Sequence, residues 1–343
     1  MILLGVLFLL WFIIAYSKRD SQMQKFDINN TLTLSSFLCL GVMMTHIVPW
    51  FPYQKSFWNQ FGIWGGIIVG MFFFKAGYGL NYSLSSKGHI YLKNFLKKKI
   101  FKIIIPLVLI TIVWQLYLYI YKGNTIVEQY KAFICDGSTF SPSSWFVYIL
   151  CLLYLLWWIL NLLDNNKKRV SLIFYLLILL YCILIKKINW WGGYTLSIWA
   201  FPLGMSYQLV EDKLYNKIIQ NRNGYLLVLF FIYILIFLYG IMAEFSFCCP
   251  GWWNLACNLL PILAVGLIYY TGFFQNVYIK GLVLISYEFY LVHACFITVY
   301  VEFIEPSNLH TFPFVVFVLF CSLIASYALK WLSALIISKK SRI

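Results

Sequence analysis

The sequence predicts an all-α membrane protein that crosses the bilayer many times, and three observations carry this prediction. Of the 343 residues, 62% are hydrophobic and only 11% are charged, where soluble chains carry roughly 25% charged residues. The mean hydropathy of +0.82 exceeds what a soluble globule can bury. The apolar residues form continuous runs, as helices require, and do not alternate as in a β-barrel. A soluble enzyme, a disordered chain and a fibrous repeat are excluded.

We expect about eleven transmembrane helices, each close to the roughly 20 residues that a crossing needs. The first segment is short, has no basic residues before it and is followed by Lys18 and Arg19. That pattern fits an anchor that enters from outside better than a cleaved signal. The longest loops are expected at 122–142 and 83–99. The expected segments are 1–16, 31–51, 61–82, 100–121, 143–163, 169–186, 191–209, 224–243, 254–274, 280–303 and 311–337.

The distribution of basic residues predicts the orientation. The chain has 26 Lys and Arg against 11 Asp and Glu, and the basic residues concentrate in alternate connectors. By the positive-inside rule these connectors and the C-terminus face the cytoplasm, and the N-terminus lies outside. The charge excess therefore reports topology and contact with membrane lipids, and we expect no nucleic-acid partner.

The nine cysteines carry no metal-binding spacing, so no metal site is predicted. Most fall inside apolar runs, where a cysteine behaves as a small apolar residue. A disulfide from Cys135 to Cys248 or Cys249 stays open as an alternative, because all three lie in or near loops on one side.

Four ionisable residues stand out within the apolar segments, where polar groups are costly and each is a candidate for function. His46 can exchange a proton near neutral pH; alternatively it forms a hydrogen bond between helices. Lys75 either acts in a site or extends its amine to the cytoplasmic surface. Glu288 needs a partner to stay charged, and Lys75, His46 and His293 are the candidates.

A basic stretch precedes Pro106 on the predicted inner face. Lys99 and Lys102 are three residues apart and share one side of a helix start, so they can hold phosphates. Lys97 and Lys98 fit the role of ordinary topology and headgroup lysines.

Taken together, these motifs resemble the membrane acyltransferase-3 family. The resemblance covers about residues 28–337. It is carried by a helix with His46, the stretch Phe72-Phe73-Phe74-Lys75-Ala76-Gly77-Tyr78, the basic pair Lys99 and Lys102 before Pro106, Trp145-Phe146-Val147, and Ile285-Ser286-Tyr287-Glu288-Phe289-Tyr290-Leu291-Val292-His293.

The resemblance implies a ten-helix core plus one N-terminal helix. Residues 1–27 would then form an anchor helix and cytoplasmic linker, and residues 28–343 the acyltransferase-3-like domain. It also implies transfer of an acyl group, by default acetyl, from cytoplasmic acyl-CoA to a hydroxyl outside the membrane. The acceptor would be a glycan or lipid-linked sugar, and the location the inner (plasma) membrane of a bacterium.

The resemblance further assigns residues. His46 matches the catalytic histidine of the family, and Lys99 and Lys102 match an arginine pair at the CoA end. Lysine keeps the charge of arginine but loses its bidentate fork. The family has an arginine eleven residues before the histidine, where this chain has Ser35. We hypothesise that Lys75 supplies the missing charge.

On this hypothesis His46 is the general base that deprotonates the acceptor hydroxyl. Glu288 is the second catalytic candidate, and Trp145, Tyr287 and His293 are candidates for substrate binding. A glycan or lipid flippase, a polymerase or another multi-span transporter is the alternative, since it too needs many helices and a polar cleft. Against a transporter, no inverted pair of broken helices is evident.

Overall fold

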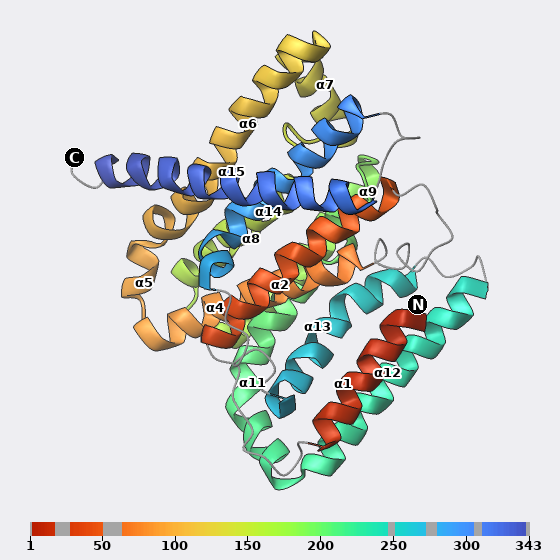
Figure 1. The fold of residues 1–343 in the computed structure, drawn as a ribbon. Helices are drawn as coiled ribbons and strands as arrows, with labels where there is room; N and C mark the ends of the chain where they lie inside the picture. The colour runs from red at the N-terminus through yellow and green to blue at the C-terminus, as the bar shows by residue number, and fades with distance from the viewer. Residues whose placement is uncertain are drawn as a thin grey trace. The chain divides into compact units, whose positions relative to one another are not determined.

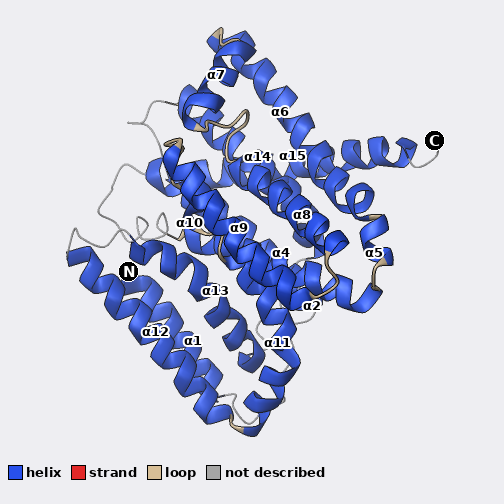
Figure 2. Cartoon of the chain, turned by 180° about the vertical axis from the view of Figure 1, so that it is seen from behind, coloured by secondary structure: helices blue, strands red, loops and turns tan. Residues whose placement is uncertain are grey.

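The computed structural model describes residues 2–17, 28–50, 64–245, 251–271, 280–304 and 311–340. Within these ranges every regular element is a helix and no strand occurs, as Figure 2 shows. The prediction of an all-α protein is confirmed.

Each of the predicted apolar segments overlaps a helix, and the segment 191–209 is divided between two helices. The long helices are α1 (Ile2–Ser17), α2 (Ile28–Ile47), α4 (Gly65–Lys87), α6 (Phe101–Lys122), α8 (Trp145–Leu163), α9 (Lys167–Lys187), α11 (Ala200–Gln220), α12 (Arg222–Phe245), α13 (Gly251–Thr271), α14 (Lys280–Phe303) and α15 (Thr311–Lys340). The short elements are the 3₁₀ turn η1 (Val48–Trp50), α5 (Ile90–Lys93), the π-helical turn η2 (Leu96–Ile100), α7 (Ile126–Asp136) and α10 (Gly193–Leu196).

Among the described residues, six stretches are helical, long and apolar enough to cross a membrane: Leu32–Trp50, Leu96–Lys122, Trp145–Leu163, Lys167–Lys187, Gly281–Phe303 and Phe312–Ser338. The protein is therefore a multi-span membrane protein. The count of about eleven crossings stays a prediction.

The chain divides into two compact units. Unit 1 comprises Met1–Leu38, Ile63–Tyr82 and Leu196–Val283, and unit 2 comprises Cys39–Gly62, Ser83–Thr195 and Leu284–Ile343. In unit 1 the N-terminal helix α1 lies beside α12 and α13 (Figure 1). Its Phe12 is 6% exposed and packs on Phe230 and Tyr233. The N-terminal helix is thus a packed part of unit 1.

Glycines bring three helices of unit 1 into close contact. A Cβ built on Gly77 would overlap the carbonyl oxygen of Phe201, and one on Gly204 would overlap that of Phe74, so α4 and α11 touch backbone to backbone. Gly70 meets the carbonyl of Cys257 on α13 in the same way. Small residues at helix contacts are the usual means of association in membranes, where apolar side chains gain little over lipid.

The expected segment 191–209 contains a break. The short α10 ends at Leu196 and α11 begins at Ala200. The Asn258 side chain of α13 joins the two ends, because its oxygen accepts from the Ala200 amide at 2.8 Å and its nitrogen donates to the Leu196 carbonyl at 3.0 Å. Free backbone groups are costly at membrane depth, so this side chain makes the break tolerable.

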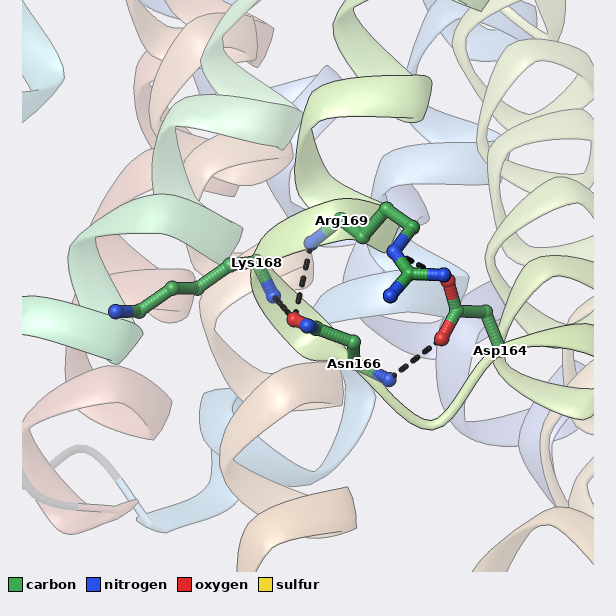
Figure 3. Close-up of polar contacts among 4 residues, drawn as sticks. All are labelled: Asp164, Asn166, Lys168 and Arg169. Carbon is green, nitrogen blue, oxygen red and sulfur yellow. Dashed lines mark hydrogen bonds and ion pairs between the residues drawn. The ribbon is translucent and has the colours of Figure 1, made fainter.

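In unit 2, α8 and α9 form an antiparallel hairpin with a three-residue connection (Figure 3). Asn166 caps α9, since its side-chain oxygen accepts from the amides of Lys168 and Arg169 at 3.1 and 3.3 Å. Asp164 accepts from the Asn166 amide at 2.8 Å and pairs with Arg169 at 3.2 Å. A cap of this kind satisfies the free amides of a helix start.

The region 122–142, expected as a loop, contains the helix α7. Thr125 and Glu128 form a capping box, and the backbone amide of Thr125 lowers the pKa of the Glu128 carboxyl. Phe133 packs on Phe140, Tyr148 and Trp190. A second set of apolar side chains is exposed: Ile126, Val127, Tyr130 and Ile134. An exposed apolar face is typical of a helix that lies in a membrane interface.

Gly77→Ala is expected to lower the thermal stability of the purified protein, because the added methyl group must separate α4 from α11. Overpacking of this kind costs about 1–3 kcal/mol. Gly79→Ala is the matched control, since nothing lies within 4 Å of a Cβ built there. Both variants gain the same helix propensity, so the difference between their unfolding midpoints in detergent isolates the packing. Equal midpoints would contradict the close approach.

Candidate active site

Two histidines from helices far apart in the sequence meet within unit 2. Nδ1 of His46 on α2 lies 2.9 Å from Nε2 of His293 on α14, and the two residues are 247 positions apart in the chain. The two ring planes are inclined by only 13°. His293 is 0% exposed, whereas His46 is half-buried. The structure thus brings together two of the four ionisable residues that the sequence singled out.

A third side chain, that of Ser143, lies beside this histidine pair. Oγ of Ser143 lies 3.3 Å from Nδ1 of His46. Ser143 has a φ of 59°, which is uncommon for a residue other than glycine. The hydroxyl of Tyr290 on α14 donates to the Ser143 carbonyl at 2.8 Å. Strained residues of this kind cluster at functional sites, so Ser143 belongs to the candidate site.

Hydrogen bonds hold the segment that carries Ser143. Gln115 on α6 donates to the Phe140 carbonyl at 2.6 Å, and the Ser144 hydroxyl donates to the Ser141 carbonyl at 2.7 Å. Ser141 and Ser144 are 1% and 0% exposed. The connection from α7 to α8 is therefore a fixed part of unit 2 that presents Ser143 to His46.

Lys75 contacts Ser35 within unit 1. The Lys75 amine donates to the Ser35 hydroxyl, from α4 to α2. Because α4 continues to Lys87, Lys75 stands about 18 Å from the end of its helix, at 1.5 Å per residue. That length and the contact with Ser35 disfavour the interpretation that Lys75 extends to the surface.

Lys99 and Lys102 are both exposed, at the start of the α6 region. Lys99 sits in the π-helical turn η2, a rare element often found at functional sites. A third lysine, Lys87 at the end of α4, is close enough for its charge to act on Lys99. The sequence did not single out Lys87, because it belongs to a different helix.

Glu288 pairs with Lys330, which the sequence did not offer as a partner. The amine of Lys330 on α15 lies 3.7 Å from the Glu288 carboxylate and donates to the Leu284 carbonyl at 2.6 Å. Glu288 is 6% exposed. Lys330 lies inside the last apolar run, so the same argument that selected Glu288 could have selected Lys330.

The remaining predicted residues have contacts with protein groups. The Tyr287 hydroxyl donates to the Ile103 carbonyl at 2.7 Å and so ties α14 to α6. Trp145 is half-buried at the start of α8, and its ring packs edge-on against Trp191 and Tyr194. Tyr287 and Trp145 both belong to unit 2.

In the part of the chain that the structure describes, no group of three or more His, Cys, Asp or Glu side chains is arranged to hold a metal ion. Cys135 is exposed at the end of α7. Cys248 and Cys249 lie outside the described residues, so the disulfide stays a prediction.

A family model for an acyltransferase domain, that of the acyltransferase-3 family, matches residues 35–331. The chain belongs to the acyltransferase-3 family. The match covers every site residue described above, from Ser35 to Lys330, and leaves out α1. No curated protein and no solved structure is significantly similar to the chain. This acyltransferase-3 protein is therefore a membrane acyltransferase.

Lys330→Met is expected to destabilise this acyltransferase, because it leaves the buried Glu288 carboxylate without its cation. Adding Glu288→Gln should recover stability, with a coupling of about 0.5–3 kcal/mol between the two sites. Unfolding midpoints of the single and double variants in detergent measure this coupling. Lys93→Met, at an exposed lysine, is the control. Additive effects of the two changes would show that the pair does not act together.

Proposed function

We propose that the protein transfers an acyl group, acetyl by default, from cytoplasmic acyl-CoA to a hydroxyl of an extracytoplasmic carbohydrate. The acceptor is a glycan or a lipid-linked sugar, and the location is a bacterial plasma membrane. The observation that carries the proposal is the histidine pair inside the matched acyltransferase domain. A titratable ring at membrane depth is a functional group by default.

His46 is the general base in this proposal. The acceptor hydroxyl gives its proton to the free nitrogen of the His46 ring, and its oxygen attacks the thioester carbonyl. When the tetrahedral intermediate collapses, the carbon–sulfur bond breaks. The thiolate leaves and takes the proton from His46, so the products are an ester and CoA with a free thiol. His46 ends in its starting state.

Lys99, Lys102 and Lys87 form the proposed site for the CoA phosphates. All three are exposed, and the charges of Lys87 and Lys102 both act on Lys99. An ammonium group binds phosphate as a point charge and lacks the bidentate geometry of arginine. The positive-inside argument puts these lysines on the cytoplasmic side, where acyl-CoA is available.

Trp145 is the proposed contact for the acceptor sugar, because its half-buried ring stands two residues from Ser143 at the start of α8. Tyr287 and His293 are held by hydrogen bonds to protein groups. We propose that Tyr287 and Glu288 have structural roles in the site. Tyr287 holds α14 against α6, and Glu288 holds α14 against α15 through Lys330.

Lys75 supplies, in this proposal, the cation that the family places on the helix of the catalytic histidine. Its amine donates to the Ser35 hydroxyl. Its positive charge therefore lies beside Ser35, the position at which the family has an arginine. The proposed role is to bind the acyl donor.

His46→Ala is expected to abolish release of free CoA thiol from acetyl-CoA by the purified protein, because the hydroxyl loses its base. Removal of a general base costs about 10²–10⁴-fold in rate. His89→Ala is the matched control, since His89 is exposed and lies between α4 and α5. Full turnover by His46→Ala would refute the proposed function.

Lys75→Ala is expected to raise KM for acetyl-CoA at least tenfold, whereas Lys75→Arg keeps the charge and most of the activity. Adding Ser35→Arg to Lys75→Ala returns a cation to α2 and should restore part of the affinity. Steady-state kinetics on the full-length protein measure both effects. Unchanged kinetics in Lys75→Ala and Lys75→Arg alike would remove this role.

A further inference from the structure

The contact between the two histidines has the geometry of an in-plane hydrogen bond. The ring centres are 5.1 Å apart and the bonded nitrogens 2.9 Å. The difference between these two distances is close to the diameter of an imidazole ring. The two nitrogens therefore lie almost on the line between the ring centres. Since the planes differ by only 13°, the rings meet edge to edge. This is the direction in which an imidazole N–H and a ring lone pair point.

The backbone of α14 fixes which nitrogen of His293 carries hydrogen. Nδ1 of His293 lies 3.2 Å from the Phe289 carbonyl oxygen, one helical turn earlier. A carbonyl oxygen only accepts hydrogen bonds, so Nδ1 must be the donor. A neutral imidazole carries one N–H, and its other nitrogen accepts. Nε2 of His293 therefore presents a lone pair to His46.

His293 is neutral in this arrangement. It is 0% exposed, and burial of an unpaired charge is costly. The nearest carboxylate in the sequence, Glu288, is paired with Lys330. Both ring nitrogens of His293 are engaged by protein groups.

The tautomer of His46 follows from that of His293. Because Nε2 of His293 accepts, Nδ1 of His46 must donate. The neutral His46 ring then has its lone pair on Nε2, which is the nitrogen directed away from His293. Ser143 fits the same assignment, since its hydroxyl oxygen at 3.3 Å is a second acceptor for the Nδ1 hydrogen.

We propose that His293 is a positioning residue that holds His46 as the Nδ1–H tautomer, so that Nε2 of His46 is the base. The proposal rests on the proposed function of His46. It replaces the prediction that His293 binds substrate. Tyr290, three residues earlier on the same face of α14, supports the arrangement by holding the Ser143 carbonyl.

The tautomer is tested directly by ¹⁵N NMR of histidine-labelled full-length protein in lipid nanodiscs. The His46 signals, assigned with His46→Gln, should show a protonated Nδ1 and an unprotonated Nε2. A protonated Nε2 in the neutral ring would overturn the proposal. This measurement needs no turnover, so it stands apart from the proposed function, which fails if His46→Ala is fully active.

Kinetic measurements distinguish a positioning role of His293 from a purely structural one. His293→Leu removes the acceptor and should lower kcat about 10–100-fold, as expected for a misplaced catalytic group, with KM for acetyl-CoA unchanged. His293→Gln supplies an amide oxygen that accepts the Nδ1 hydrogen, so it should recover most of kcat. Cys295→Ala, at a buried residue of the same helix, is the control. Full turnover by His293→Leu, or equal loss in the Leu and Gln variants, would overturn the proposal.

Discussion

One constraint organises the polar groups of this protein: at membrane depth each of them needs a partner from the protein, because lipid offers none. The hydrogen bond between His46 and His293 satisfies this constraint for two rings at once. In our proposal it also has a direction, since the Phe289 carbonyl accepts from His293 and His293 accepts from His46. On that proposal, a requirement of folding determines which nitrogen of His46 is free to take a proton.

The same constraint explains two further buried polar contacts, each of which joins two helices within one unit. In unit 1 the Tyr78 hydroxyl of α4 donates to the Glu211 carboxylate of α11 at 2.7 Å, and Glu211 is 7% exposed. In unit 2, Lys330 joins α15 to α14 through Glu288. Such contacts specify which helices are neighbours. Apolar side chains specify this only weakly, because they pack almost as well against lipid as against another helix.

The sequence predicted the helices well, because the length of an apolar run is a property of consecutive residues. It also found His46, His293, Lys75 and Glu288, since the cost of a polar group at membrane depth needs no tertiary information. It could not pair them, because pairing depends on which helices are neighbours. Lys330 was missed although it lies inside the last apolar run, where the same argument applies. The helix α7 was missed although its sequence carries the capping box of Thr125 and Glu128, a signal that needs no tertiary information.

The basic residues of this chain differ from those that the family resemblance implies, and the positions of their charges explain how such a difference can be tolerated. The field of a cation depends on where the charge lies and not on which helix carries it. The Lys75 amine meets Ser35 from the neighbouring helix, so a charge can be supplied at α2 without a basic residue on α2. At the other group, Lys87, Lys99 and Lys102 come from two helices and a π-helical turn. In the proposed phosphate site these three point charges hold an anion from separate elements, without the fixed geometry of an arginine fork.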